Sequence, residues 1–140
     1  MMKNKILIGR RAETPRGEFT FPRRDIYVYF GSADNETFGA GICRIPPGSS
    51  NEMHVHNDGD EVIYVIEGQM RLLIDGQEEI LGQSDAVLIL KGQEHQIFNN
   101  SKTADLVHTF TFCPPKPADD IRCGYGRDPE KFKIYPPEKQ

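Results

Sequence analysis

The stretch that decides the fold covers residues 48–68 and reads GSSNEMHVHNDGDEVIYVIEG. Two histidines separated by one residue, His54 and His56, come first, and the turn-forming residues NDGD follow at 57–60. The rest of the stretch is rich in β-branched and aromatic residues, which favour strands. Turn residues between short runs of this kind are typical of antiparallel sheets. We therefore expect a short strand over 53–56, a turn, and a longer strand over 61–67 that ends at Gly68.

The same rhythm continues on both sides of this stretch. Glycine (13) and proline (10) lie singly or in pairs between short apolar runs, which indicates an all-β chain and excludes a helical bundle. Residues 46–48 (PPG) stop one strand because proline cannot donate to a sheet, and residues 75–76 (DG) are a type I′ hairpin signal. The further predicted strands are 25–30, 38–45, 70–74, 77–81, 86–90, 95–99 and 105–113. About ten strands at this spacing predict a sandwich or a barrel.

The two ends of the chain differ from this central region. Residues 1–24 contain five arginines and no periodic pattern, so we expect an N-terminal arm with at most a short strand over 6–8. Residues 25–113 form the predicted β-barrel domain. Prolines stop the last strand at the start of the tail, residues 114–140, in which Asp128 is placed to cap one helical turn. Phe132, Ile134 and Tyr135 are expected to hold this tail on the barrel or on a dimer partner.

Charge and composition exclude several classes of protein. Lysine and arginine number 17 against 21 aspartates and glutamates, a net charge of −4, which argues against binding nucleic acid through its phosphates. The longest apolar runs, 62–66 and 86–90, are far shorter than the ~20 residues that cross a bilayer, and the N-terminus lacks the core of a signal peptide. The three cysteines have no Cys-x-x-Cys spacing, so free thiols are expected. Together these features predict a soluble cytoplasmic protein.

Four polar side chains are placed to meet in the interior. On a strand, residues i and i+2 project from the same face about 6.6–6.8 Å apart, so His54 and His56 can converge on one ion. Glu61 begins the strand after the turn, where its carboxylate can point back toward them, and His95 begins a later strand. Three imidazoles and one carboxylate suit a divalent transition metal (Fe, Mn, Ni, Co, Cu or Zn) better than Ca or Mg. The pattern therefore predicts one metal site with these four ligands.

Glycines frame these ligands in a recognisable way. Residues 48–68 fit the pattern G-x5-H-x-H-x4-E-x6-G, and this resembles the first sequence motif of the cupins at every fixed position. The end of a second motif is similar to that of the cupins too, with Gly92, His95 and Asn99. Its beginning departs from the family, since Leu90 replaces the usual proline and Ser84 stands where glycine is usual.

The resemblance covers residues 38–113 and implies a specific architecture. Cupins are small conserved β-barrels, so it implies a jelly-roll, or double-stranded β-helix, of two antiparallel sheets with one metal ion inside. It also implies a homodimer.

Several other polar residues have two interpretations each. His108 shares a predicted strand face with Phe110 and Phe112; a lone histidine there is more often packed in the core, but it would contact substrate or carry protons if this face lines the cavity. Arg44 would clamp a substrate carboxylate if it pointed inward, although most strand arginines face solvent. Tyr64 should point away from the metal, and Glu52 should lie either behind the metal ligands or at the rim. The predicted core comprises Ile63, Val65, Met70, Leu72, Ile74, Val87, Ile89 and Ile97.

The predicted function is that of a metal-binding cupin with a pocket for a small molecule. Four protein ligands on an octahedral ion leave two positions open, as a catalytic site requires, which favours a mononuclear non-haem metal enzyme. Small cupins of this kind include dioxygenases, decarboxylases, isomerases and lyases, so the resemblance implies one of these types. A ligand-binding or sensor module without turnover is the alternative, and an interaction scaffold is a third. Because ligand histidines must be neutral, metal affinity should fall as the pH drops below about 6.5.

Overall fold

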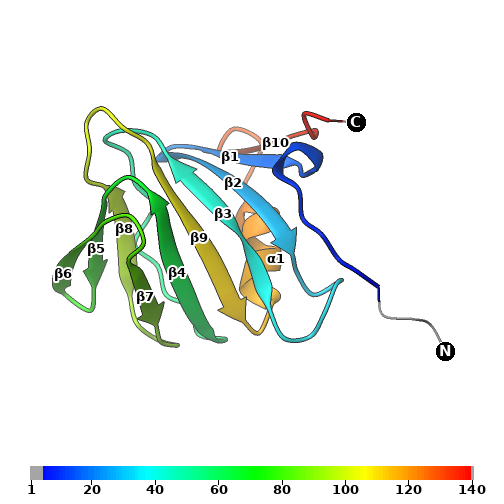
Figure 1. Cartoon of the computed structure of the whole chain (residues 1–140), viewed down its shortest axis with the longest axis horizontal. Coiled ribbons are helices and arrows are strands. Elements are labelled where there is room, and N and C mark those ends of the chain that lie inside the picture. The colour runs from blue at the N-terminus through cyan, green and yellow to red at the C-terminus, as the bar shows by residue number, and fades with distance from the viewer. Residues whose placement is uncertain (1–4, 140) are drawn as a thin grey trace.

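Two antiparallel sheets make up most of the molecule. The structure is a computed structural model, which describes residues 5–139 of the 140-residue chain. The larger sheet has the strand order β10-β1-β2-β3-β9-β4-β7, and the smaller one has the order β6-β5-β8. Figure 1 shows the small sheet beside the β4–β7 end of the large one. The chain is thus mostly β, with two antiparallel sheets as predicted, and it also contains one α-helix.

The strand bounds follow the predicted rhythm closely in the middle of the chain. The elements are η1 (Arg11–Glu13), β1 (Arg16–Thr20), β2 (Arg23–Phe30), β3 (Gly39–Ile45), β4 (Asp60–Glu67), β5 (Met70–Ile74), β6 (Gln77–Leu81), β7 (Ala86–Ile89), β8 (His95–Asn99), β9 (Leu106–Cys113), α1 (Lys116–Arg122), η2 (Gly124–Gly126) and β10 (Phe132–Tyr135).

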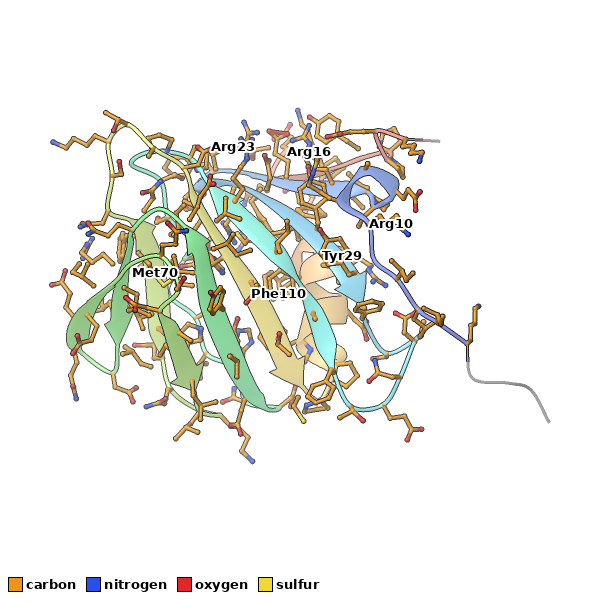
Figure 2. The ribbon with its side chains drawn as sticks, in the orientation of Figure 1. Arg10, Arg16, Arg23, Tyr29, Met70 and Phe110 are labelled. Carbon is orange, nitrogen blue, oxygen red and sulfur yellow. The ribbon has the colours of Figure 1, made fainter. Side chains whose placement is uncertain are left out.

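Alternating side chains on β4 show why the sheets enclose an interior. Ile63 and Val65 are fully buried, whereas Tyr64 between them is 41% exposed on the outer face. Burying such an aliphatic side chain contributes roughly 1.5–3 kcal/mol. The predicted core is confirmed, because six of its members are buried and Ile74 and Val87 pack against them. Figure 2 shows Met70 on the small sheet and Phe110 near the middle of the large one.

Two tight turns keep the geometry that their residue types predict. Asp75 and Gly76 both have positive φ, 47° and 78°, as a type I′ hairpin requires. Ser84 also lies in the left-handed region, with a φ of 73°. The conformation that favours glycine is therefore kept at this position, where the chain departs from the second cupin motif.

The N-terminal region is more regular than predicted. Residues 16–20, which were expected to belong to an irregular arm, form strand β1, and Phe19 in this strand is 1% exposed. The short strand expected over 6–8 is absent from the described residues, and Ile6 and Ile8 are largely exposed. The charged residues of β1 interrupt the alternation of apolar residues from which the other strands were predicted.

The C-terminal region also differs from the prediction. Helix α1 begins directly after the prolines, because proline is tolerated in the first turn of a helix. One helical turn does follow Asp128, as predicted: its carboxylate accepts from the amides of Glu130 and Lys131, and the amide of Phe132 donates to its carbonyl at 3.1 Å. Strand β10 then pairs with β1, and Phe132 packs against Phe19 with ring centroids 4.8 Å apart.

Helix α1 is also what closes one side of the interior. It packs against β2, β3 and β9, and Figure 1 shows it behind these strands. Its residue Ile121 and the following Tyr125 reach the main cavity. None of the helices within residues 5–139 is both long and apolar enough to span a membrane.

Candidate metal centre

Main-chain hydrogen bonds bring His54 and His95 face to face. The amide of each residue donates to the carbonyl of the other at 2.9 Å, so that an isolated bridge forms where a strand over 53–56 was predicted. The amide of Gly92 donates to the carbonyl of His56 at 2.9 Å, and Gly92 has a φ of 87° that favours glycine. The two histidine motifs are therefore held together by their backbones.

Three imidazoles converge at this point. The ring centroids of His54 and His95 are 4.2 Å apart, those of His54 and His56 are 4.8 Å apart, and those of His56 and His95 are 5.4 Å apart. One nitrogen from each ring lies within 4.8 Å of the other two. The structure thus brings together residues that are up to 41 positions apart in the sequence.

The hydrogen bonds of the rings fix which nitrogen faces the centre. Nδ1 of His54 lies 2.7 Å from the carbonyl oxygen of Glu52, and Nδ1 of His95 lies 2.9 Å from that of Gln93. A carbonyl only accepts, so both Nδ1 atoms carry the hydrogen and both Nε2 atoms present a lone pair. This is the arrangement in which imidazole binds a metal.

Glu61 completes the cluster from strand β4. It is 5% exposed, and its Oε1 lies 3.6 Å from Nε2 of His56 and 3.5 Å from Nε2 of His95. These three atoms are buried and have no hydrogen-bond partner among the described residues. Leaving buried polar atoms unpaired is costly, and a divalent cation would satisfy all of them. The donor set therefore fits a transition metal ion.

Burial also sets the protonation of this cluster. It lowers the pKa of His54 to about 3 and that of His56 to about 4, and the nearby His95 adds to both shifts. Burial raises the pKa of Glu61, which His95 only partly offsets. Burial disfavours the imidazolium form of His95 too, but the Glu61 carboxylate outweighs it and raises the pKa of His95. Two of the three rings are therefore neutral, the form that binds metal, well below pH 6.5.

The cluster opens into a cavity of about 300 Å³. Apolar and aromatic side chains line about half of it, and besides the cluster its polar residues include His108, Arg24 and Arg127. Burial raises the pKa of the Cys43 thiol to about 12, so this cysteine is a protonated wall residue rather than a nucleophile. A cavity of this size, with polar groups set in an apolar wall, fits a small molecule.

The other candidate residues divide between the two faces of the sheet. His108 is 4% exposed on the inner face and lines the cavity. Arg44 lies on the outer face, where it pairs with Asp25 at 2.8 Å and with Asp105 at 3.1 Å, so its predicted role as a substrate clamp in this cavity is wrong. Its strand parity explains this, because Cys43 and Ile45 take the inward positions. Glu52 lies at the rim, one of its two predicted positions, and pairs with Arg127 at 2.6 Å.

Arg24 is a cavity residue that the sequence argument missed. It is 6% exposed and lines the same cavity as the histidines. The signal was available, because on strand β2 Arg24 has the same parity as the buried Ile26 and Val28. The neighbouring arginines obscured it.

Comparisons with known proteins agree with this geometry. A family model described as a cupin domain matches residues 41–111, just over half of the chain. The chain is 31% identical over 78 residues to the tetracenomycin polyketide synthase protein TcmJ of Streptomyces glaucescens, and 31% identical over 72 residues to the pectin degradation protein KdgF of Dickeya dadantii. These matches cover 55% and 51% of this chain, but only 52% and 63% of the two relatives.

Solved structures show the same fold. An RmlC-like cupin from Shewanella frigidimarina superimposes with a TM-score of 0.65 at 20% identity, covering 81% of this chain and 95% of that chain. At this identity the likeness concerns the fold alone.

Proposed function

Because the chain belongs to the cupin family, we propose that it binds one divalent transition metal ion through His54, His56, His95 and Glu61 and acts on a small molecule in the adjoining cavity. One observation carries this proposal. Nε2 of His56, Nε2 of His95 and Oε1 of Glu61 are buried without a hydrogen-bond partner among residues 5–139, and the Glu61 oxygen lies 3.6 Å from the first nitrogen and 3.5 Å from the second. The two sheets and the cupin neighbours support a jelly-roll around this site.

The residues of the chain prepare the site for such an ion. The carbonyls of Glu52 and Gln93 hold the rings of His54 and His95 in one tautomer. The ring of Phe112 packs edge-on against His56 at a centroid distance of 4.8 Å and keeps water from that side. When bound, the metal would supply Lewis acidity and a template for substrate at its open positions.

Turnover is the better-supported role for this pocket. Both curated relatives carry names from metabolism, one from pectin degradation and one from polyketide synthesis, which supports an enzyme of the dioxygenase, decarboxylase, isomerase or lyase type. A binding or sensor module without turnover is the second candidate. It would hold the same metal and ligand but form no product when Fe(II) or Mn(II) protein is incubated with that ligand under air.

Metal analysis of the purified protein tests the proposal. Wild type, His95→Ala and His108→Ala are compared by inductively coupled plasma mass spectrometry after loading with one metal and desalting. His108 is a matched control, because it is a buried histidine of the same cavity but is not in the cluster. We expect about one ion per chain in wild type and His108→Ala and a loss of at least about tenfold in His95→Ala. Equal metal in all three proteins would contradict the proposal.

A further inference from the structure

Arg24 is a buried cation without a carboxylate partner. Its side chain donates one hydrogen bond, from Nη1 to the carbonyl of Pro22 at 3.2 Å, and its guanidinium lies 3.8 Å from the centre of the Phe19 ring. No carboxylate of residues 5–139 lies within ion-pair distance of it. Arginine is almost never this buried unless it is paired. The remaining guanidinium donors therefore have no anionic partner within residues 5–139.

The position of Arg24 shows where a partner would lie. Arg24 lines the same cavity as His54, His56 and Glu61. The second arginine of this cavity, Arg127, is already paired with Glu52 at 2.6 Å. Arg24 is thus the one cavity arginine, among the described residues, that is left for a ligand.

His108 offers the complementary group on the same wall. Its Nδ1 donates to the carbonyl of Thr109 at 2.8 Å, so Nε2 bears a lone pair. This Nε2 is buried and has no hydrogen-bond partner among residues 5–139. An acceptor of this kind calls for an O–H or N–H donor on the ligand.

We propose that Arg24 and His108 form the substrate-recognition part of the cavity and select a small carboxylic acid that also bears a hydroxyl group. Arg24 binds the carboxylate, and Nε2 of His108 accepts a hydrogen bond from the hydroxyl. This subsite deepens the proposed function. It rests on the proposed function for the role of the metal, but binding of the acid by Arg24 and His108 does not require the metal.

A carboxylate fits this subsite better than a phosphate does. A single guanidinium matches the two oxygens of a carboxylate with two parallel hydrogen bonds. The cavity also contains Glu52 and Glu61, whose charges oppose a dianion more than a monoanion. The apolar remainder of the wall, including Phe110 and Phe112, suits a carbon body rather than a second charge.

Three related probes separate the two contacts. Mandelate carries the carboxylate and the hydroxyl, mandelamide lacks the charge, and phenylacetate lacks the hydroxyl. Binding of each is measured by isothermal titration calorimetry to metal-loaded wild type, Arg24→Met, Arg24→Lys, Arg127→Met and His108→Phe. Inorganic phosphate is titrated as a fourth probe.

We expect Arg24→Met and His108→Phe each to lose a different one of the two binding preferences. Wild type prefers mandelate to mandelamide by at least about tenfold, as a charge-assisted hydrogen-bonded pair implies. Arg24→Met abolishes this preference, Arg24→Lys restores part of it, and Arg127→Met keeps it. His108→Phe keeps it too, but loses the preference of about fivefold for mandelate over phenylacetate.

Contrary results are equally specific. An unchanged mandelate preference in a folded Arg24→Met protein overturns the Arg24 subsite, and tighter binding of phosphate than of mandelate overturns the choice of a carboxylate. The titrations are repeated after EDTA treatment. A preference for mandelate that still depends on Arg24 in metal-free protein supports the subsite even if the proposed metal binding fails. A protein that binds metal but shows no Arg24-dependent preference contradicts the subsite and leaves the metal proposal intact.

Discussion

Arg24 and Asp25 are neighbours on strand β2, and both are buried, yet their surroundings are opposite. Asp25, 1% exposed, faces the outer side of the large sheet, where Arg16, Arg23 and Arg44 contact it at 3.1, 3.1 and 2.8 Å. Figure 2 shows Arg16 and Arg23 near one end of that sheet. Arg24 faces the inner cavity and has no such partner in the described part of the chain.

This difference separates a structural charge from a functional one. The outer hollow around Asp25 is larger, about 510 Å³, but its charges satisfy one another. The inner cavity is smaller, about 300 Å³, and is lined by His56, Glu61 and His108, each of which has a buried polar atom without a hydrogen-bond partner among residues 5–139. Unsatisfied buried groups are rare in folded proteins, so the place where they gather is the place where a ligand belongs.

The largest expected effect concerns only the inner face. Adding Ni²⁺ to EDTA-treated protein at about 1,000 times its Kd should raise the free energy of unfolding by about 4 kcal/mol, because the ion binds only the folded state. Urea denaturation followed by circular dichroism measures this. Asp25→Asn should gain the same increment and His95→Ala none. A stabilised His95→Ala protein would show that the ion binds elsewhere.

The second prediction uses pH to separate the inner face from the outer one. Burial lowers the pKa of His108 to about 4, and the hydrogen bond to Thr109 offsets only part of this. The unfolded chain, with a pKa near 6.5, therefore takes up the proton first as the pH falls. The contribution of His108 to the free energy of unfolding should therefore decrease between pH 6.5 and 4 and level off below that.

A variant isolates this contribution from those of His54 and His56. In metal-free protein, His108→Phe should lose roughly 3 kcal/mol less than wild type between pH 7 and pH 4. Equal losses in urea titrations of the two proteins would mean that His108 is not held neutral.

The third prediction tests the outer face. Asp25→Asn should lower the free energy of unfolding by about 2 kcal/mol, below the usual cost of breaking a buried ion pair because the arginine partners are partly exposed. Burial opposes ionisation of Asp25, but Arg44 and Arg23 outweigh it and lower its pKa. Its contribution is therefore present above pH 3.8 and lost as the pH falls below that value. The exposed pair of Asp105 is the control, and Asp105→Asn should change stability by less than about 0.5 kcal/mol.

The smallest expected effect is that of Arg24→Met on stability. Removing an unpaired buried cation relieves its desolvation, while the contact with the Phe19 ring is lost. We expect a net change within about 1 kcal/mol in thermal and urea unfolding, toward greater stability if desolvation dominates. A loss above about 2 kcal/mol would make Arg24 a structural residue like Asp25 and remove the contrast between the two faces.

The meeting of the three histidines and Glu61 was predictable from the sequence, because most of these residues lie close together in the chain at a regular spacing. His54, His56 and Glu61 lie within eight residues, and His95 stands in the second motif with Gly92 and Asn99. Strand β4 was predictable for the same reason, since strict alternation places Glu61 inside and Tyr64 outside. Its physical basis is that one sheet face is buried and the other solvated.

What the sequence did not reveal depends on pairing between distant segments. Strand β1 forms because it pairs with β2 on one side and β10 on the other, and the sequence of residues 16–20 by itself does not predict this pairing. The burial of Phe19 against Phe132 has the same origin. The roles of Arg44 and Arg24 needed strand parity as well as residue type, because only the register decides which arginine faces the cavity.

The most direct test of the metal centre is a crystal structure of the metal-loaded protein with diffraction data collected at the absorption edge of the loaded ion. We expect one anomalous peak, bonded to Nε2 of His54, His56 and His95 and to a carboxylate oxygen of Glu61. A peak bonded to other residues, or no peak in this cavity from protein that carries one ion per chain, would contradict it.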